Sequence, residues 1–132
     1  LGEAEISYAG PNATVRARLA ADTVVERMRR RAPGLKVRVD AIGLVSVLGG
    51  DDGAFARAGD IAANDVRLRF AAQSVERAEV ELLLDEVEAL YCAGPAGGAG
   101  VRRRITPRLA SASCLIEREF SRPRIVMLGN EA

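Results

Sequence analysis

The residues of this chain best suited to binding chemistry lie in one glycine- and arginine-rich stretch, residues 94–104. Glycine leaves the backbone N–H groups uncovered, so that they can face an anion, and arginine adds paired hydrogen bonds to a phosphate or carboxylate. A strand after the glycines would direct Arg102 and Arg104 to one face and Arg103 to the other. The anion-binding residues predicted from this stretch are Gly97, Gly98, Gly100, Arg102 and Arg104.

The same stretch has a purely structural interpretation. Gly94 and Pro95 follow the clearest helical pattern of the chain, and a Gly-Pro pair is typical of a helix C-terminus. Phosphate-binding loops lead from a strand into a helix N-terminus, whereas this stretch leaves a helix C-terminus, where the helix dipole is negative. A tight capping turn would need the same glycines, so the sequence leaves both interpretations open.

The residue types that carry most enzyme chemistry are absent or isolated. The chain contains no histidine, so it cannot form an imidazole base, a Ser-His or Cys-His pair, or a histidine metal site. Cys92 and Cys114 lie among apolar or small residues without C-x-x-C spacing, and we expect both thiols to be buried and unreactive. The sequence therefore assigns no catalytic residue and no cofactor, and an independent enzyme is the least favoured class.

Residues 49–64 hold four glycines and three aspartates without any regular period. Such a segment is long for a connection inside a compact domain. Asp51, Asp52 and Asp60 lack the spacing of a calcium-binding loop, so we expect a solvated loop and no metal site.

The bulk composition fits one soluble domain. The 132 residues are 48 % apolar and 28 % charged, which is ordinary for a protein with its own hydrophobic core. A net charge of +1 excludes strong general attraction to nucleic acid or to an anionic membrane. The sequence shows no signal peptide and no apolar run of transmembrane length, so we expect a cytoplasmic protein with reduced thiols.

The hydrophobic pattern predicts the order strand, helix, strand, strand, helix, strand. Strands are expected at 4–8, 35–48, 65–72 and 101–116, and helices at 11–32 and 76–91. The second strand is apolar on both faces after Ala41, which favours a central position. Pro107 interrupts the last strand and implies an edge position or a bend, because proline cannot donate to the ladder. A final apolar segment, 125–128, would be a short extra strand or part of a linker.

Each predicted helix carries one apolar stripe that should face a single sheet. The stripes are Ala13, Ala17, Ala20, Val24 and Met28 in the first helix, and Val80, Leu83, Leu84, Val87, Leu90 and Tyr91 in the second. This arrangement favours an α+β fold, the ferredoxin-like (split βαβ) two-layer sandwich, with two helices on one face of a mainly antiparallel sheet. The alternative is a mixed α/β sheet that forms an incomplete piece of a larger domain.

Several stretches resemble a known family. They are residues 2–11 (Gly-Glu-Ala-Glu-Ile-Ser-Tyr-Ala-Gly-Pro) with the arginine- and alanine-rich helix after them, 87–91 (Val-Glu-Ala-Leu-Tyr), 94–102 (Gly-Pro-Ala-Gly-Gly-Ala-Gly-Val-Arg) and 115–119 (Leu-Ile-Glu-Arg-Glu). Together they resemble the C-terminal third of the acyclic terpene utilisation (AtuA-like) family over nearly the whole chain. The family usually carries Thr-Asn or similar where this chain has Cys92-Ala93, which argues against a role for these two side chains.

The resemblance implies a bacterial cytoplasmic protein linked to the breakdown of branched acyclic terpenoid acids, whose intermediates are CoA thioesters. It also implies that about two thirds of a family member lies upstream of this chain, which would be one domain, 1–132, of a longer protein. It supplies no catalytic residues.

We therefore expect a module that helps to bind an acyl-CoA or another anionic ligand at residues 94–104. The competing expectation is a structural or oligomerisation module without a ligand. The expected partners are the upstream part of the same protein and further copies of the chain, because a sheet with a free edge tends to pair. Neither nucleic acid nor a membrane is an expected partner.

Overall fold

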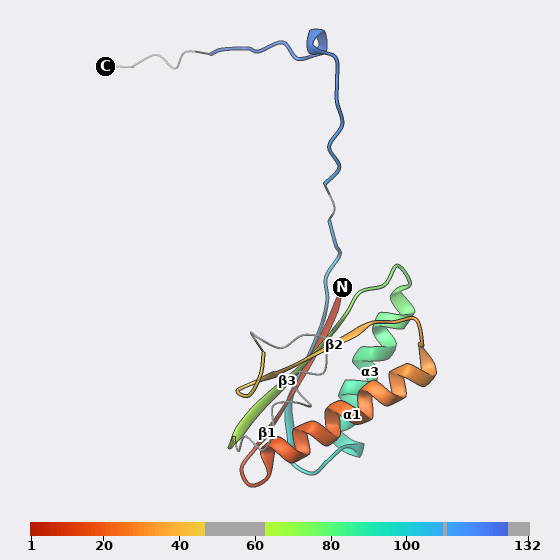
Figure 1. Cartoon of the computed structure of the whole chain (residues 1–132), viewed down its shortest axis with the longest axis vertical. Coiled ribbons are helices and arrows are strands. Elements are labelled where there is room, and N and C mark those ends of the chain that lie inside the picture. Colours follow the sequence, from red (N-terminus) through yellow and green to blue (C-terminus); the bar gives the residue numbers. More distant parts are fainter. Residues whose placement is uncertain (47–62, 110, 127–132) are drawn as a thin grey trace, which may run out of the picture.

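The computed structural model describes residues 1–46, 63–109 and 111–126 of the chain. Its elements are β1 (Gly2–Ala9), α1 (Ala13–Arg31), β2 (Val37–Ile42), β3 (Asp65–Ala72), α3 (Arg77–Ala93), β4 (Gly98–Ile105) and the 3₁₀ turn η1 (Arg118–Phe120). The strands form one antiparallel sheet in the order β2-β3-β1-β4, and both helices cover the same face of it (Figure 1). This architecture confirms the predicted ferredoxin-like sandwich.

The core lies between the sheet and the two helices. In β1, Ala4, Ile6 and Tyr8 are buried, and in β3 the buried side chains of Val66, Leu68 and Phe70 lie on the same face. The predicted stripe of α1 is buried along its whole length, and so is that of α3 from Val80 to Leu90. Tyr91 is the exception. Its side chain is 62 % exposed, because the turn of the helix carries this position past the sheet.

The second strand is shorter than predicted and lies at an edge. Among the described strands β2 pairs with β3 alone, and it ends at Ile42, so the expectation of a central strand over 35–48 is wrong. Gly43 has φ 99° and turns the chain back, and Ala41 exchanges backbone hydrogen bonds with Val45 at 2.8 and 3.0 Å. A Cβ at Gly43 would lie 2.8 Å from the Asp65 carbonyl oxygen, so only glycine fits there. Residues 47–62, with Asp51, Asp52 and Asp60, lie outside the described part of the chain.

The last strand begins earlier and ends earlier than predicted. The pairing of β4 with β1 runs from Gly98 opposite Tyr8 to Ile105 opposite Gly2. Two more bonds follow, from Thr106 N to Leu1 O at 2.8 Å and from the Leu1 amino group to Thr106 O at 3.2 Å, and Pro107 then has no N–H to donate. Residues 107–109 and 111–126, here called the extended segment, lead away from the sheet (Figure 1). Residues 106–109 and 111–116 are therefore not strand, and neither are Ile125 and Val126.

Candidate functional site

The predicted glycine turn is divided between a helix end, a turn and a strand. Gly94 closes α3 with a 3.0 Å hydrogen bond from its N–H to Leu90 O, and an added Cβ would lie 2.5 Å from that oxygen. Gly97 and Gly100 have φ 79° and 65°, in the region that favours glycine. Gly98 is the first residue of β4, and its φ is not positive.

Arg16 on α1 holds the turn that precedes β4. Its Nη1 donates to Ala96 O at 2.7 Å, and its Nη2 donates to Ala9 O at 2.6 Å and to Pro11 O at 2.9 Å. A Cβ at Gly97 would lie 2.5 Å from Arg16 Nη1, so the guanidinium fills the space that a side chain would need. No local sequence pattern points to this role of Arg16, because the Ala96 carbonyl lies 80 residues away along the chain.

The buried Tyr8 side chain explains why position 98 is a glycine. The guanidinium carbon of Arg16 lies 5.9 Å from the centre of the Tyr8 ring, a cation–π distance. A Cβ at Gly98 would lie 2.9 Å from Ile6 Cδ1 and 3.2 Å from the Tyr8 hydroxyl oxygen. Burial raises the pKa of the Tyr8 hydroxyl, and the Arg16 charge opposes this shift. Gly97 and Gly98 are thus fitted to Arg16 and Tyr8 by close packing.

The face of the sheet away from the helices, here called the open face, carries alternating charges. Arg67 and Arg69 on β3 lie between Glu3 and Glu5 on β1 and Asp40 on β2. Arg67 Nη1 donates to Glu5 Oε2 at 2.8 Å, and Arg69 donates both to Glu3 and, at 2.8 Å, to Asp40. Each of the three carboxylates therefore has an arginine partner from β3.

Arg102 and Arg104 reach the same open face from the other side of β1. In the register of the sheet Arg102 lies opposite Glu5, and Arg104 lies opposite Glu3. Within the part of the chain that the structure describes, neither arginine forms an ion pair. Arg104 Nε donates to Thr106 Oγ1 at 2.8 Å. The two side chains have room for an additional acceptor.

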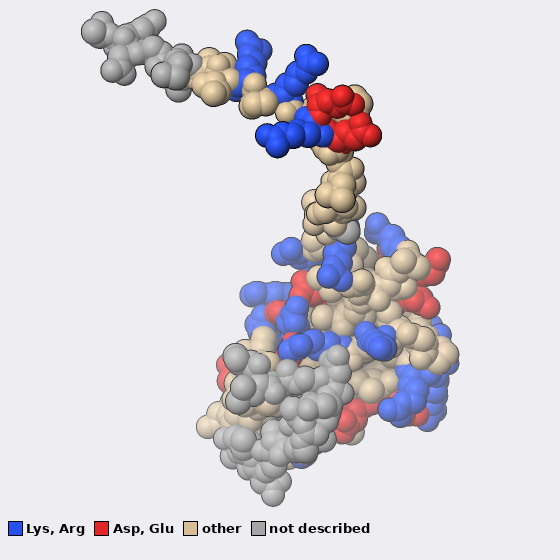
Figure 2. All heavy atoms as spheres, turned by 45° about the horizontal axis from the view of Figure 1, so that its top comes forward, with Lys and Arg blue, Asp and Glu red and all other residues tan. Residues whose placement is uncertain are grey.

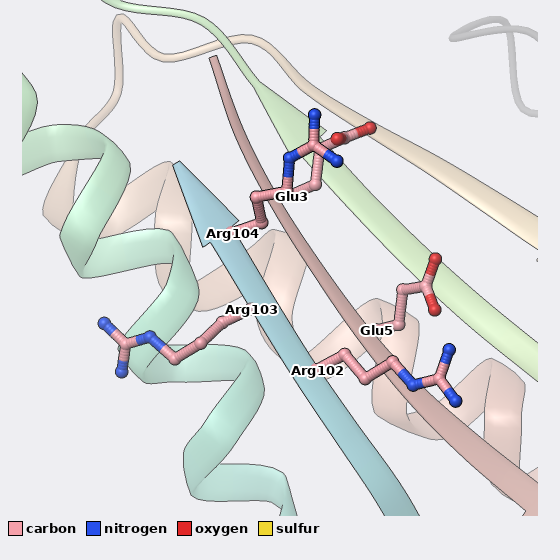
Figure 3. Close-up of a pocket in the computed structure, with 5 residues that line it drawn as sticks. All are labelled: Glu3, Glu5, Arg102, Arg103 and Arg104. Carbon is pink, nitrogen blue, oxygen red and sulfur yellow. The ribbon is translucent and has the colours of Figure 1, made fainter. Parts of the chain in front are cut away.

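Arg103 takes the opposite direction, as strand alternation predicts. Its side chain points toward α3 (Figure 3). There the guanidinium lies 3.0 Å from Asp85 Oδ1 and contacts Glu88. The hydrogen bond to Glu88 raises the pKa of Arg103 above its ordinary value. The predicted separation of Arg103 from its two neighbours is confirmed.

The two arginines border a shallow hollow at the edge of the open face. It measures about 330 Å³ and is lined by Glu3, Glu5 and the three consecutive arginines (Figure 3). The structure thus brings Arg102 and Arg104 together, whereas Gly97, Gly98 and Gly100 are not among the lining residues. Gly100 borders the open face elsewhere, where a Cβ would lie 4.0 Å from Ser7 Oγ and from Arg67 Nη2.

Both cysteines are exposed, so the expectation of buried thiols is wrong. Cys92 follows the buried stripe of α3 by two residues and therefore points away from the sheet. Cys114 lies in the extended segment after β4. Small, apolar sequence neighbours indicated burial for these residues, but the packing of each element decided their exposure.

Two further findings concern residues 1–46, 63–109 and 111–126. No group of three His, Cys, Asp or Glu side chains is placed there to hold a metal ion. No helix in these ranges has the length and apolar character needed to cross a bilayer.

Comparison with known proteins places the chain in a family. Searches of curated proteins and of solved structures found no match. The family model described as "Acyclic terpene utilisation family protein AtuA" matches residues 1–127, which is nearly the whole chain. It agrees with the resemblance carried by the stretches at both ends of this range. The chain therefore belongs to the acyclic terpene utilisation family AtuA.

Proposed function

We propose that this chain is a ligand-binding module of an acyclic terpene utilisation protein and that Arg102 and Arg104 bind the phosphate or carboxylate groups of an acyl-CoA-type ligand. One observation carries the proposal. Both guanidinium groups lie on the open face beside a hollow, while the carboxylates of that face are already paired with the arginines of β3.

The charges of the open face support an anionic ligand. Within the described strands, five arginines (Arg38, Arg67, Arg69, Arg102 and Arg104) share this face with four carboxylates (Glu3, Glu5, Asp40 and Asp65), which leaves one positive charge in excess. The excess lies on β4, because Arg38 and Arg69 both contact Asp40 and Arg67 contacts Glu5. An anionic group bound to Arg102 and Arg104 would neutralise it.

The spacing of the two arginines also suits a phosphate-bearing ligand. Residues two apart on a strand are separated by roughly 6.4–6.8 Å, so two guanidinium groups can hold one anion between them or two adjacent phosphates. The hollow of about 330 Å³ is comparable with the smallest ligand sites, and the remainder of a larger ligand would extend beyond it.

Calorimetric titration with CoA, an acyl-CoA, inorganic pyrophosphate and a short branched carboxylic acid tests the proposal. Charge-assisted hydrogen bonds contribute about 1.5–3 kcal/mol each, so Arg102→Ala and Arg104→Ala should each weaken binding about ten-fold or more. Pyrophosphate binding would identify the phosphate groups as the recognised part, and binding of the carboxylic acid alone would identify the carboxylate.

The matched control is Arg30→Ala, which removes the same charge from the exposed surface of α1, where Arg30 pairs with Glu26 at 2.8 Å. Its binding should stay within about two-fold of the unaltered protein, because a single remote surface charge is screened by salt. Equal binding by all variants, or no binding of any of these ligands, would contradict the proposal.

A further inference from the structure

The extended segment after β4 carries large apolar side chains that the described part of the chain leaves exposed. Leu109, Leu115, Ile116, Phe120, Ile125 and Val126 are each at least 65 % exposed. Figure 2 shows that acidic and basic side chains accompany them, well away from the body of the domain. Apolar surface of this extent gains free energy when a partner covers it.

β4 offers a free edge next to this segment. Among the described residues β4 is the last strand of the sheet and pairs with β1 alone. The backbone N–H and C=O groups of every second residue of β4 therefore point away from the sheet. The pairing is regular from Arg102 to Ile105, and the ladder is irregular at Gly100 and Val101, which both stand opposite Ile6. Residues 102–105 thus offer a regular edge for an additional strand, and Val101 lies at the bulge where this regular stretch begins.

The sequences of the edge and of the segment complement each other in one antiparallel register. Residues 101–105 read Val-Arg-Arg-Arg-Ile, and residues 120 back to 116 read Phe-Glu-Arg-Glu-Ile. The register joins Val101 to Phe120, Arg102 to Glu119, Arg104 to Glu117 and Ile105 to Ile116. Two apolar pairs thus flank two oppositely charged pairs, which are the combinations that stabilise neighbouring strands.

Both faces of the sheet accept this register. Val101 and Ile105 pack against the core on the helix-covered face, where Phe120 and Ile116 would extend it. On the open face Glu119 and Glu117 would meet Arg102 and Arg104, which form no ion pair within the described chain. The central pair, Arg103 and Arg118, joins like charges. Asp85 and Glu88 already lie against Arg103 and supply two carboxylates for the two guanidinium groups.

We infer that residues 116–120 of one copy of this chain add as a fifth strand to the β4 edge of a second copy. The occupant is a second copy because the chain leads its own segment away from its own sheet (Figure 1). Since each copy carries both halves of the contact, reciprocal exchange closes a two-fold dimer. The exchange opens η1, and ladder bonds replace the two 3.0 Å bonds that Phe120 N and Ser121 N donate there.

This inference does not rest on the proposed ligand. The two are linked all the same, because Glu117 and Glu119 of the second copy and an anionic ligand would compete for Arg102 and Arg104. A saturating CoA-type ligand should therefore raise the dissociation constant of the dimer.

Sedimentation velocity of the whole chain over a wide concentration range, without ligand, tests the dimer. Phe120→Ser removes one apolar pair and should raise the dissociation constant about ten-fold or more, as expected for an aromatic side chain central to an interface. Ile125→Ser is the matched control, because Ile125 is 84 % exposed and lies outside the register. Neither side chain belongs to the core, so both variants should fold.

A charge exchange tests the register itself. The double variants Glu117→Arg/Glu119→Arg and Arg102→Glu/Arg104→Glu should each be monomeric, because like charges then face each other across the edge. An equimolar mixture of the two should form a heterodimer, since opposite charges meet again at both contacts. In the dimer, the backbone amides of residues 116–120 should be protected from hydrogen exchange.

Three outcomes would overturn the inference. The first is a monomer at every concentration. The second is a dimer whose dissociation constant is unchanged by both Phe120→Ser and the charge exchange. The third is a monomer in which residues 116–120 are protected from hydrogen exchange because they pair within their own chain. The ligand proposal is judged separately, by calorimetry on the Phe120→Ser variant, which keeps Arg102 and Arg104. Loss of the dimer with retained CoA binding, or the reverse, separates the two.

Discussion

The Glu86 carboxylate on α3 lies 3.0 Å from Nη2 of Arg27 on α1, and it joins the two helices where they cross the sheet. Arg31, one turn further along α1, donates to the same carboxylate. The Glu86 side chain is only 4 % exposed, whereas both arginines reach solvent. The hydrogen bond from Arg27 lowers the pKa of Glu86 below its ordinary value, against the opposing effect of burial.

Replacing Glu86 by alanine should destabilise the domain. The substitution removes the shared acceptor of Arg27 and Arg31, and hydrogen bonds to charged groups contribute about 1.5–3 kcal/mol each. Because the two arginines can turn to solvent, we expect a net loss of about 1–3 kcal/mol in the free energy of unfolding. Glu81→Ala is the control on the same helix. Its exposed pair with Arg77 should contribute less than about 1 kcal/mol, and equal losses in chemical denaturation would contradict a special role for Glu86.

The pH dependence of stability should carry the signature of Glu86. Its pKa is lower in the folded protein than in the unfolded chain, so its contribution is fully present above the unfolded value of about 4.3. That contribution is lost as the pH falls through the lowered folded pKa. The difference in unfolding free energy between the unaltered protein and Glu86→Gln should therefore be constant above about pH 5 and shrink in acid. A difference that stays constant down to acid pH would show that the carboxylate charge is not involved.

The local patterns of the sequence were sufficient for the helices and for the faces of the strands. The apolar stripes of α1 and α3 repeat every three or four residues, and the alternation at 102–104 separates Arg103 from its neighbours. Each of these predictions needs only the sequence of a single helix or strand. The fold class follows from the order of these elements.

The contacts that define the candidate site were beyond the reach of local patterns. Arg67 and Arg69 on β3 form hydrogen bonds with the carboxylates of β1. In each of these contacts the two residues lie more than sixty positions apart in the sequence. The ladder between β4 and β1 stops at Ile105 opposite Gly2, shortly before Pro107, and the strand pattern predicted from 101 to 116 could not show where this pairing stops. In the same way, only the β1–β4 register shows that Gly98 lies against Tyr8.

Gly98→Ala should destabilise the domain through packing, because a Cβ would lie 2.9 Å from Ile6 Cδ1 and 3.2 Å from the Tyr8 hydroxyl oxygen. Overpacking of this kind costs about 1–3 kcal/mol, and valine at the same position should cost more. Gly34→Ala is the matched control, since a Cβ there meets nothing within 4 Å. It should leave the thermal midpoint unchanged or raise it slightly, because alanine reduces the freedom of the unfolded chain. Equal midpoints for the two variants would mean that Tyr8 and Ile6 yield without cost.

Arg16 provides the test that separates the two interpretations of the glycine-rich stretch. Its guanidinium donates to three backbone carbonyls, those of Ala9, Pro11 and Ala96. Arg16→Ala should cost about 1–3 kcal/mol of unfolding free energy, and Arg16→Lys should recover only part of it, because an ammonium lacks the fork of the guanidinium. Arg29→Ala, on the exposed face of the same helix, should cost less than about 1 kcal/mol.

If the glycines only shape a turn, Arg16→Ala should lower stability and speed hydrogen exchange at residues 96–98 while leaving the dissociation constant for CoA unchanged. Arg102→Ala should do the reverse, weakening the ligand with little change in stability, because its guanidinium forms no ion pair within the described chain. Loss of ligand affinity in Arg16→Ala at temperatures where the variant is fully folded would instead place the turn inside the binding site, together with Gly97 and Gly98. Calorimetry and denaturation on the same two variants therefore assign the glycines either to the fold or to the ligand.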